Sequence, residues 1–366
     1  MITQADKPRI LIFSQRNIFS NALFRGPLYE FENVISQIDS VEILAPQADP
    51  FNLHHRIAKR IAYHAPIALN PGIPRIKPKA HYDLFLAICG APGDLLMVNA
   101  VSNWKDVCKT SVCLMDELWV TQMFNYRYFL RILEKFDVVM LYYSQSVKAL
   151  SDQIGRKCVF LPPGVDTILF CPYPEQPKRV VDVYSIGRKS EITHRRLLKI
   201  VAENGLFYLH DSIAGDQAIN LMEHRTLLAN LAKKSRYFIV NPGLIDRPDK
   251  RGDQMEIGNR YFEGAASGAI MVGERPQNAE FARLFDWPDA VIHLPYDSSD
   301  IDTVIYDLDR HPEKQDRIRR TNVVQALMRH DWVYRWEAML KTVGLEPMPK
   351  LMARKERLKN LAEVVS

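Results

Sequence analysis

The stretch GNRYFEGAASGAIMVGE, residues 258–274, places an arginine and a glutamate three positions apart. We expect a helix that begins near Asn259. Its first free N–H groups and the positive end of its dipole would then be available for an anion. Arg260 adds a forked donor that suits a phosphate. Glu263, one turn into the helix, can accept two hydrogen bonds from a vicinal diol such as a ribose. Together these residues predict a nucleotide site, and a carboxylate stabilised only by the helix dipole is the alternative.

The residues that follow have almost no side chain. Gly264–Gly268 reads GAASG, and the apolar run AIMVG of Ala269–Gly273 comes next. Small residues allow a helix to lie close to its neighbours, and the apolar run is typical of a buried strand. We therefore expect a helix packed tightly against a sheet.

The N-terminal half offers two further carboxylates in the stretch SVCLMDELW. Asp116 and Glu117 directly follow the apolar run Ser111–Met115, at the carboxyl end of an expected strand. Either side chain could accept a proton from a bound substrate. A carboxylate that caps the next helix is the alternative.

Short apolar runs alternate with amphipathic helical stretches along the whole chain, and these runs show little polar alternation. Such runs are typical of parallel strands that are buried on both faces. The expected strands are Arg9–Ser14, Val41–Pro46, Asp83–Ile88, Ser111–Met115, Asp137–Tyr143, Cys158–Pro162, Val180–Gly187, Leu206–His210, Arg236–Val240, Ala269–Gly273 and Val291–Pro295. Between two of them, residues 144–155 predict a helix with Ser144 as N-cap and Gly155 as C-cap.

A proline-rich stretch, Leu161–Arg179, interrupts this alternation with five prolines. We expect the domain boundary there: an N-terminal Rossmann-like domain, 1–172, a C-terminal Rossmann-like domain, 173–335, and a helical tail, 336–366, that packs back on the first domain. Two such α/β domains have a cleft between the carboxyl ends of their parallel sheets, and ligands bind in such crevices.

Composition limits the function classes. The formal net charge of +5 and a charged fraction of 25% suit a soluble globular protein and do not argue for nucleic acid. Five cysteines without C-x-x-C spacing predict reduced thiols in a cytoplasm, and no Cys/His spacing predicts a metal site. The first apolar run is too short for a signal peptide, and no run is long enough for a transmembrane helix.

The stretch FEGAASGAIMVGE resembles the signature region of GT-B glycosyltransferases of the large retaining family 4. FLPPGVDTILFCP (Phe160–Pro172) and DVYSIGRKSEITHRRLLKI (Asp182–Ile200) resemble the segments where those enzymes pass into and open their second domain. HDWVYRWEAML (His330–Leu340) is similar to the CgeB-type branch. The resemblance covers roughly Asp137 to Leu340. It implies a GT-B fold and the transfer of a hexosyl group from a nucleotide-sugar to an unknown acceptor, with retention, without a metal and without a cofactor.

The resemblance also implies roles for single residues. Glu263 matches the glutamate that binds the donor ribose, and Arg188 matches the arginine that meets the donor diphosphate. The family's lysine a few residues later has no exact match, and the nearest basic residues are Arg195 and Arg196, of which we select Arg195. Fixed cations would stabilise the charge that builds on the leaving diphosphate. A surface arginine after a strand is the alternative for Arg188.

Two positions depart from the family pattern. Met255 stands where the family has a first glutamate, and Glu256 lies one residue further on. Met115 stands where many relatives have a histidine. With Asp116, Glu117 and Glu256 as catalytic candidates we expect a glycosyltransferase, and the departures leave open a nucleotide-sugar epimerase of the same fold or a catalytically silent sugar-nucleotide-binding protein.

The segment Phe51–Lys79 contains six Lys or Arg, three His and no acid. Its first half predicts a basic amphipathic helix of the kind that lies on anionic membrane surfaces. Some members of the family act on lipid acceptors in this way, which would place the protein on the inner face of the membrane. An acceptor-side loop with a solvated basic face is the alternative, and we expect no nucleic acid partner.

Overall fold

The computed structural model describes residues 7–20, 22–49, 52–211 and 219–366. The chain divides into two compact units. The first unit comprises Met1–Pro162 with Ile219–Leu221 and Arg335–Met352, and the second comprises Pro163–Ala218, Met222–Tyr334 and Ala353–Ser366. The expected tail, 336–366, is thus divided between the units. Residues 336–352 belong to the first unit, and the last fourteen residues belong to the second.

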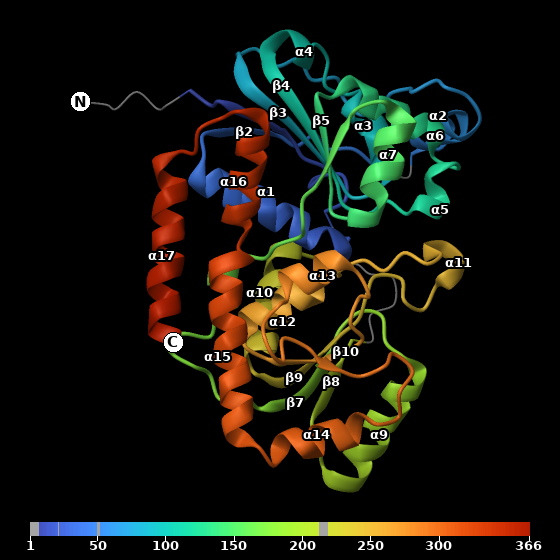
Figure 1. The fold of residues 1–366 in the computed structure, drawn as a ribbon. Helices are drawn as coiled ribbons and strands as arrows, with labels where there is room; N and C mark the ends of the chain where they lie inside the picture. The colour runs from blue at the N-terminus through green and yellow to red at the C-terminus, as the bar shows by residue number, and fades with distance from the viewer. Residues whose placement is uncertain (1–6, 21, 50–51, 212–218) are drawn as a thin grey trace. The chain divides into compact units, whose positions relative to one another are not determined.

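The first unit is built on a six-stranded parallel sheet in the order β2-β1-β3-β4-β5-β6 (Figure 1). The strands are β1 (Ile10–Phe13), β2 (Val41–Leu44), β3 (Tyr82–Cys89), β4 (Cys108–Met115), β5 (Val138–Leu141) and β6 (Lys157–Phe160). All six were predicted, because unbroken runs of β-branched and aromatic residues suit strands that are covered on both faces.

Helices connect these parallel strands, as parallel pairing requires. They are α1 (Gly26–Ile38), α2 (Leu53–His64), α3 (Leu95–Val98), α4 (Trp104–Val107), α5 (Val120–Met123), α6 (Arg127–Leu130) and α7 (Val147–Ile154). One hydrophobic core contains Phe13, Phe85 and Met115 of the sheet together with Ala58 of α2 and Phe129 of α6.

The prediction of a helix at residues 144–155 is confirmed at its C-terminal end only. Gly155 is the C-cap, with φ of 61°. The N-cap prediction for Ser144 is wrong, because Ser144 begins a 3₁₀ turn that ends at Ser146, and the α-helix starts at Val147. A tight 3₁₀ turn at a helix start is common and leaves no clear sequence signal.

The second unit is built on a five-stranded parallel sheet in the order β11-β10-β9-β7-β8. The strands are β7 (Val181–Ser185), β8 (Tyr208–His210), β9 (Ser235–Val240), β10 (Ile270–Gly273) and β11 (Ile292–His293), all of them predicted. The helices are α8 (Thr167–Phe170), α9 (Glu191–Asn204), α10 (Leu221–Lys233), α11 (Pro248–Arg251), α12 (Asn259–Ser267), α13 (Ala279–Leu284), α14 (Ile301–Asp309) and α15 (Pro312–Arg329). The chain ends with α16 (Trp332–Val343) and α17 (Pro349–Val365).

The helix expected near Asn259 is α12, and it lies directly on the second sheet. A Cβ atom added at Gly264 would stand 2.7 Å from Met271 of β10 and 3.0 Å from Phe238 of β9. Any larger side chain at this position would push the helix away from the strands. The small residues after Glu263 therefore hold α12 against the sheet, as the sequence predicts.

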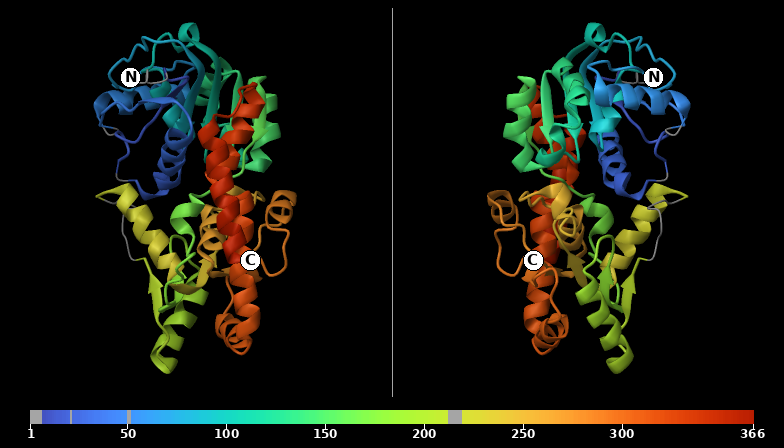
Figure 2. Two further views of the ribbon diagram at one scale, coloured as in Figure 1. Left: turned by 90° about the vertical axis from the view of Figure 1, so that its left-hand side faces the viewer. Right: turned by 90° about the vertical axis from the view of Figure 1, so that its right-hand side faces the viewer.

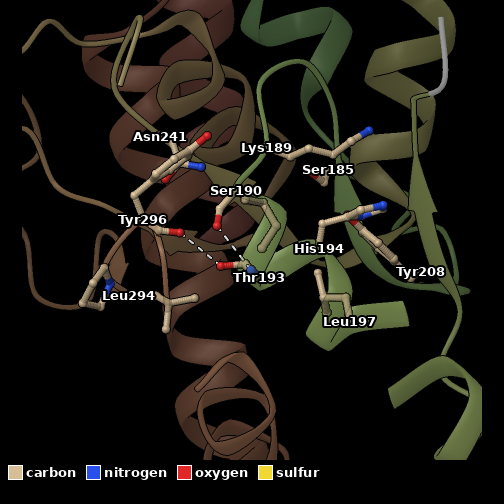
Figure 3. A pocket seen from close by; sticks show the side chains of 13 residues that line it. Ser185, Lys189, Ser190, Thr193, His194, Leu197, Tyr208, Asn241, Leu294 and Tyr296 are labelled. Carbon is tan, nitrogen blue, oxygen red and sulfur yellow. Dashed lines mark hydrogen bonds between the residues drawn. The ribbon is translucent and has the colours of Figure 1, made fainter. Parts of the chain in front are cut away.

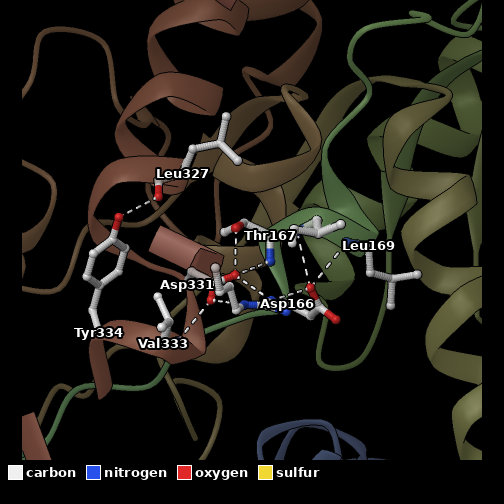
Figure 4. A network of polar contacts seen from close by, with 9 residues as sticks. Asp166, Thr167, Leu169, Leu327, Asp331, Val333 and Tyr334 are labelled. Atoms are coloured by element: carbon white, nitrogen blue, oxygen red, sulfur yellow. Dashed lines mark hydrogen bonds and ion pairs between the residues drawn. The ribbon is translucent and has the colours of Figure 1, made fainter. Parts of the chain in front are cut away.

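Two motifs that are far apart in the sequence meet inside the second unit. Val165 and Asp331 form a parallel bridge, and the Asp331 carboxylate accepts hydrogen bonds from the backbone N–H of Thr167 at 3.0 Å and from Arg354 of α17 at 2.8 Å (Figure 4). Arg354 also donates to Asp166 at 2.7 Å. This network fastens the start of the second unit to the end of the chain.

Two tryptophans near the end of the chain anchor helices. Trp332 and Trp336 are completely buried. Within the first unit, the Trp336 indole N–H donates to the Asp39 carboxylate at 2.9 Å. Figure 2 gives two further views of these helices. None of the helices in the described part of the chain is long and apolar enough to cross a bilayer.

Candidate functional site

The carboxylate of Glu263 lies between two arginines inside the second unit. One of its oxygens accepts from Arg225 of α10, and the other accepts from Arg260, one turn earlier on α12. The glutamate is completely buried, Arg225 is almost completely buried, and Arg260 is partly exposed. The contact is therefore a compact triad with one excess positive charge, and the helix dipole alone does not account for it.

The triad also fixes the charge of Glu263. Burial by itself would raise the pKa of this carboxyl group, but Arg260 and Arg225 outweigh burial by charge and by hydrogen bonding, so its pKa lies below the ordinary value. The glutamate is thus ionised at neutral pH, and it holds both guanidinium groups in fixed positions.

The residues just before α12 are ordered by local hydrogen bonds. Glu256 is buried, and its carboxylate accepts from the Gln254 amide at 2.7 Å. Its backbone oxygen accepts from Gly243 N–H at 3.1 Å, which ties this loop to the segment after β9. At the first residue of α12, the buried Oδ1 atom of Asn259 has no hydrogen-bond partner among the described residues.

A pocket lies at the carboxyl edge of the second sheet (Figure 3). Ser185, Lys189 and His194 line it on the side of β7 and α9, and Asn241 and Tyr296 line it on the other side. The floor is fastened by Thr193 of α9, whose hydroxyl donates to the backbone oxygen of Tyr296 at 3.1 Å. Ligands of open α/β sheets bind at this edge.

Most of the pocket wall is uncharged. The ring of His194 lies 3.0 Å from the Tyr208 hydroxyl, and burial, with the neighbouring His210 and Lys189, lowers the pKa of His194. The imidazole is therefore neutral at pH 7. Lys189 is the cation that the pocket receives from the loop after β7.

That loop carries Arg188 and Lys189 side by side. Gly187 has φ of +88°, which an L side chain rarely adopts, and its N–H donates to the Asp211 carboxylate at 2.9 Å. Lys189 donates to the Asp211 backbone oxygen at 2.8 Å. Arg188 has half of its side chain exposed and contacts Asp246 at 3.1 Å. Gly187 thus makes a tight turn directly before Arg188.

Arg195 and Arg196 lie on α9 with other partners. Arg195 is 77% exposed and pairs with Glu191 one turn earlier on the same helix, at 2.7 Å. Arg196 pairs with Asp302 of α14. Neither lines the pocket described above, whereas Lys189 does.

In the first unit, Asp116 and Glu117 follow β4 at the carboxyl edge of the sheet. Their N–H groups donate to the backbone oxygens of Cys89 and Gly90, at 2.9 and 3.1 Å. The Glu117 carboxylate accepts from the Trp119 indole at 2.6 Å and does not cap the next helix. Burial first, and then the negative charge of Glu117, raise the pKa of Asp116 to about 8.

Beside these carboxylates lies a buried ion pair that the sequence did not reveal. Arg25 donates twice to Asp94, at 2.8 and 2.9 Å, and once to Gln15 at 2.9 Å. Asp94 also accepts from the N–H groups of Gly90 and Ala91 at 2.8 and 3.0 Å. The stretch CGAPGD, Cys89–Asp94, is therefore held closed by its own last residue.

The structure thus brings together some of the predicted residues. Arg260 contacts Glu263, whereas Arg188 and Arg195 each contact a different acid. The sequence also missed two residues: Arg225, which is 38 positions before Glu263, and Lys189, which follows Arg188 directly. Only Lys189 had a local signal, its place beside an expected phosphate-binding arginine. Across the described residues, no group of three or more His, Cys, Asp or Glu is placed to hold a metal ion.

Comparisons with solved structures define the class of fold. The Anabaena protein HepE, in complex with UDP-glucose, is 14% identical, with 92% of this chain and 99% of that chain covered and a TM-score of 0.53. An alpha-glucosyltransferase in complex with UDP and a 13-mer DNA is 11% identical, with 92% and 99% covered and a TM-score of 0.51. A glycosyltransferase from Rickettsia africae is 11% identical, with 92% and 98% covered and a TM-score of 0.50. These similarities confirm the GT-B fold.

The family comparison defines the second half of the chain more closely. Residues 188–341 match a family model described as glycosyl transferase-like. This region is therefore similar to a glycosyl transferase-like family, in agreement with the resemblance found in the sequence. No curated protein is significantly similar to the chain.

Proposed function

We propose that the protein transfers a hexosyl group from a nucleotide-sugar to an acceptor hydroxyl, with retention at the anomeric carbon and without a metal ion. The observation that carries the proposal is the buried triad of Arg225, Glu263 and Arg260, inside the region that matches the glycosyl transferase-like family. A triad with one excess positive charge suits a substrate with two phosphates.

In this proposal, the second unit binds the donor. Arg188, Lys189 and Arg260 meet the diphosphate, and Asn259 offers its buried oxygen to the nucleotide at the start of α12. Arg195, which is more exposed, is a further candidate. Glu263 accepts the ribose hydroxyls, since a carboxylate has about four acceptor positions and only two are used by the arginines. Because Glu263 is buried, the partly exposed Arg260 has to shift when the ribose binds.

The first unit supplies the acceptor side. Asp116 and Glu117 stand at the carboxyl edge of its sheet, where one of them receives the acceptor proton or orients the donor sugar. Glu256 of the second unit is the third catalytic candidate and, from its place in the sequence, would contact the sugar. The acceptor is a small molecule, a glycan or a lipid.

The nucleotide is tested first. HepE was solved with UDP-glucose and the alpha-glucosyltransferase with UDP, so uridine diphosphate is the first choice, followed by GDP and ADP. Isothermal titration should show micromolar binding of one of the three. Absence of binding by all three would contradict the proposal.

Donor sugars then separate the three candidate activities. Incubation of the full chain with UDP-sugars and acceptor mixtures, followed by NMR of the anomeric proton, should show a transferred sugar with retained configuration. An epimerised nucleotide-sugar would instead identify the epimerase, and binding without any conversion would identify the silent binding protein. Activity that survives EDTA would support a reaction without a metal.

A further inference from the structure

Helix α2 faces the solvent with its larger apolar side chains. Ala58 and Ala62, four residues apart, are buried to 1% exposure, and the half-buried Tyr63 packs against the same core. On the outer face, Leu53 is 65% exposed and Ile57 is 47% exposed. A helix that packs only on the core of its own protein has the reverse pattern.

The same outer face is strongly basic. Arg56 and Arg60 are exposed and lie one turn apart, next to Ile57. From residue 52 to residue 79 the described chain contains no Asp or Glu, and Arg75, Lys77 and Lys79 are exposed as well. The aliphatic side chains are therefore surrounded by positive charge and by no acid of their own segment.

An exposed aromatic side chain lies on a neighbouring segment of the first unit. α2 packs on α6, and the Tyr63 ring stands 5.0 Å from Phe129. Just before α6, Phe124 is 72% exposed, and the Arg127 guanidinium lies 4.4 Å from the centre of its ring. Figures 1 and 2 show α2, in blue, at the edge of the first unit. The docking surface proposed below consists of the outer face of α2 together with Phe124 on the segment before the neighbouring α6, and both carry exposed apolar groups next to arginines.

We propose that this surface of the first unit docks on an anionic lipid bilayer. Membrane-surface helices place aliphatic and aromatic side chains among the acyl chains while neighbouring Lys and Arg meet the anionic headgroups. Two other occupants fit less well. Nucleic acid would leave Leu53 and Ile57 without a stacking role, and a second copy of the chain would place two basic faces against each other.

The docking surface also borders the carboxyl edge of the first sheet. Lys59 of α2 reaches the loop of Asp94, since its Cε atom stands 4.0 Å from where a Cβ would lie on Gly93. Burial and then Lys59 lower the pKa of His55, on the same helix, and the charge of Asp94 opposes this shift. Docking through α2 would therefore place the edge that holds Asp116 close to the lipid headgroups. If the proposed transferase function holds, this favours an acceptor that is carried by a lipid.

Vesicle flotation of the full chain tests the docking. We expect co-flotation with vesicles of phosphatidylcholine and 30% phosphatidylglycerol (a chosen composition), and little with phosphatidylcholine alone. The double substitution Arg56→Glu/Arg60→Glu should reduce the bound fraction at least about tenfold, because each basic side chain adds to binding at an anionic surface. Leu53→Ser/Ile57→Ser keeps the charge and should also reduce binding, because it removes the aliphatic anchors.

The matched control reverses two charges elsewhere in the same unit. Arg156 and Lys157 are exposed at the amino end of β6, the end opposite to the docking edge of that sheet, so Arg156→Glu/Lys157→Glu should float like the unchanged protein. Equal losses in the control and the α2 variants would overturn the proposal, because they would show a response to net charge alone.

Further outcomes separate this proposal from the proposed function. No flotation of the unchanged protein would overturn the docking, and so would tight binding of a single-stranded oligonucleotide in the absence of flotation. Titration of each variant with UDP reports on folding and on the donor site. Unchanged UDP binding together with lost flotation would support the docking, whereas a protein that floats and binds no nucleotide would contradict the transferase alone.

Discussion

Two carboxyl groups, one in each unit, have opposite charge states at neutral pH. Glu263 in the second unit has a lowered pKa, although it is completely buried. Asp116 in the first unit has its pKa raised to about 8, so it is mostly protonated at pH 7. Burial raises both pKa values, and the neighbouring charges make the difference. Two arginines contact Glu263, whereas Asp116 has Glu117 beside it.

The difference indicates two kinds of chemistry. The donor side of a glycosyltransferase has to hold a fixed charge against a diphosphate, and a carboxylate that stays ionised keeps its arginines in place. The acceptor side has to exchange a proton, which is most effective for a group whose pKa is near the working pH. The first unit therefore suits proton transfer and the second unit suits binding of an anion.

The largest expected effect comes from removing Arg225. Arg225→Met removes the partner of one carboxylate oxygen of the buried Glu263. The free energy of unfolding, measured by urea denaturation, should fall by about 3–5 kcal/mol. Arg260→Met removes a partly exposed partner and should cost only about 1 kcal/mol.

The double variant Arg225→Met/Glu263→Met sharpens the result. Replacing both members of a buried pair by apolar groups is often neutral or stabilising, so this variant should be more stable than Arg225→Met. If the double variant were as unstable as the single one, packing and not charge would explain the effect, and the triad would lose its assigned role.

The next effect concerns the affinity for the nucleotide. Arg188→Ala and Arg260→Ala should each weaken UDP binding tenfold or more in isothermal titration, because each removes a charge-assisted contact with a phosphate. The loss should shrink at high salt, since both arginines are partly exposed. Lys199→Ala, on the exposed side of α9, is the control and should bind UDP like the unchanged protein.

Two more variants decide which cation takes the place of the family's lysine. If pocket geometry decides, Lys189→Ala should weaken UDP binding more than Arg195→Ala, because Lys189 lines the pocket and Arg195 is exposed beside Glu191. The opposite order would favour the assignment made from the resemblance.

A further effect should appear in the pH dependence of stability. The pKa of Asp116 rises from 3.8 to about 8 on folding, so ionisation is penalised in the folded state. This contribution is favourable below about pH 4 and is lost as the pH rises to about 8. Asp116→Asn should therefore stabilise the protein relative to the unchanged chain at pH 9 more than at pH 5, as measured by urea midpoints.

A variant of the neighbour tests the cause. Glu117→Gln removes the negative charge beside Asp116 and keeps its burial, so the pH dependence should become weaker without disappearing. A difference between Asp116→Asn and the unchanged protein that does not change from pH 5 to pH 9 would contradict the raised pKa.

The sequence predicted all eleven strands, because a strand covered on both faces needs a continuous apolar run and that pattern is local. It also predicted where α12 starts, because Asn259, Arg260 and the following small residues stand together. The resemblance to GT-B enzymes added the name of the fold and the roles of single residues, which the apolar runs alone leave open.

The partners of the site residues could not be predicted in the same way. Arg225 belongs to an ordinary amphipathic helix, and only the three-dimensional packing brings it to Glu263. Asp331 likewise meets Thr167 across 164 positions of the chain. Such contacts depend on how helices pack across a sheet, and no local pattern in a single sequence predicts this packing. The charge state of Asp116 depends on burial and on Arg25, Asp94 and Glu117 together.

The smallest effect distinguishes a turn that serves binding from one that serves folding alone. Gly187 and Gly155 both have positive φ, +88° and +61°, and a Cβ at either position would meet no atom within 4 Å. Gly187→Ala and Gly155→Ala should therefore each cost about 1 kcal/mol of stability from backbone strain, as urea denaturation would measure. Only Gly187 precedes Arg188 and Lys189 and donates to Asp211. Gly187→Ala should weaken UDP binding several-fold while Gly155→Ala leaves it unchanged, and equal affinities would show that the loop after β7 does not position the cations.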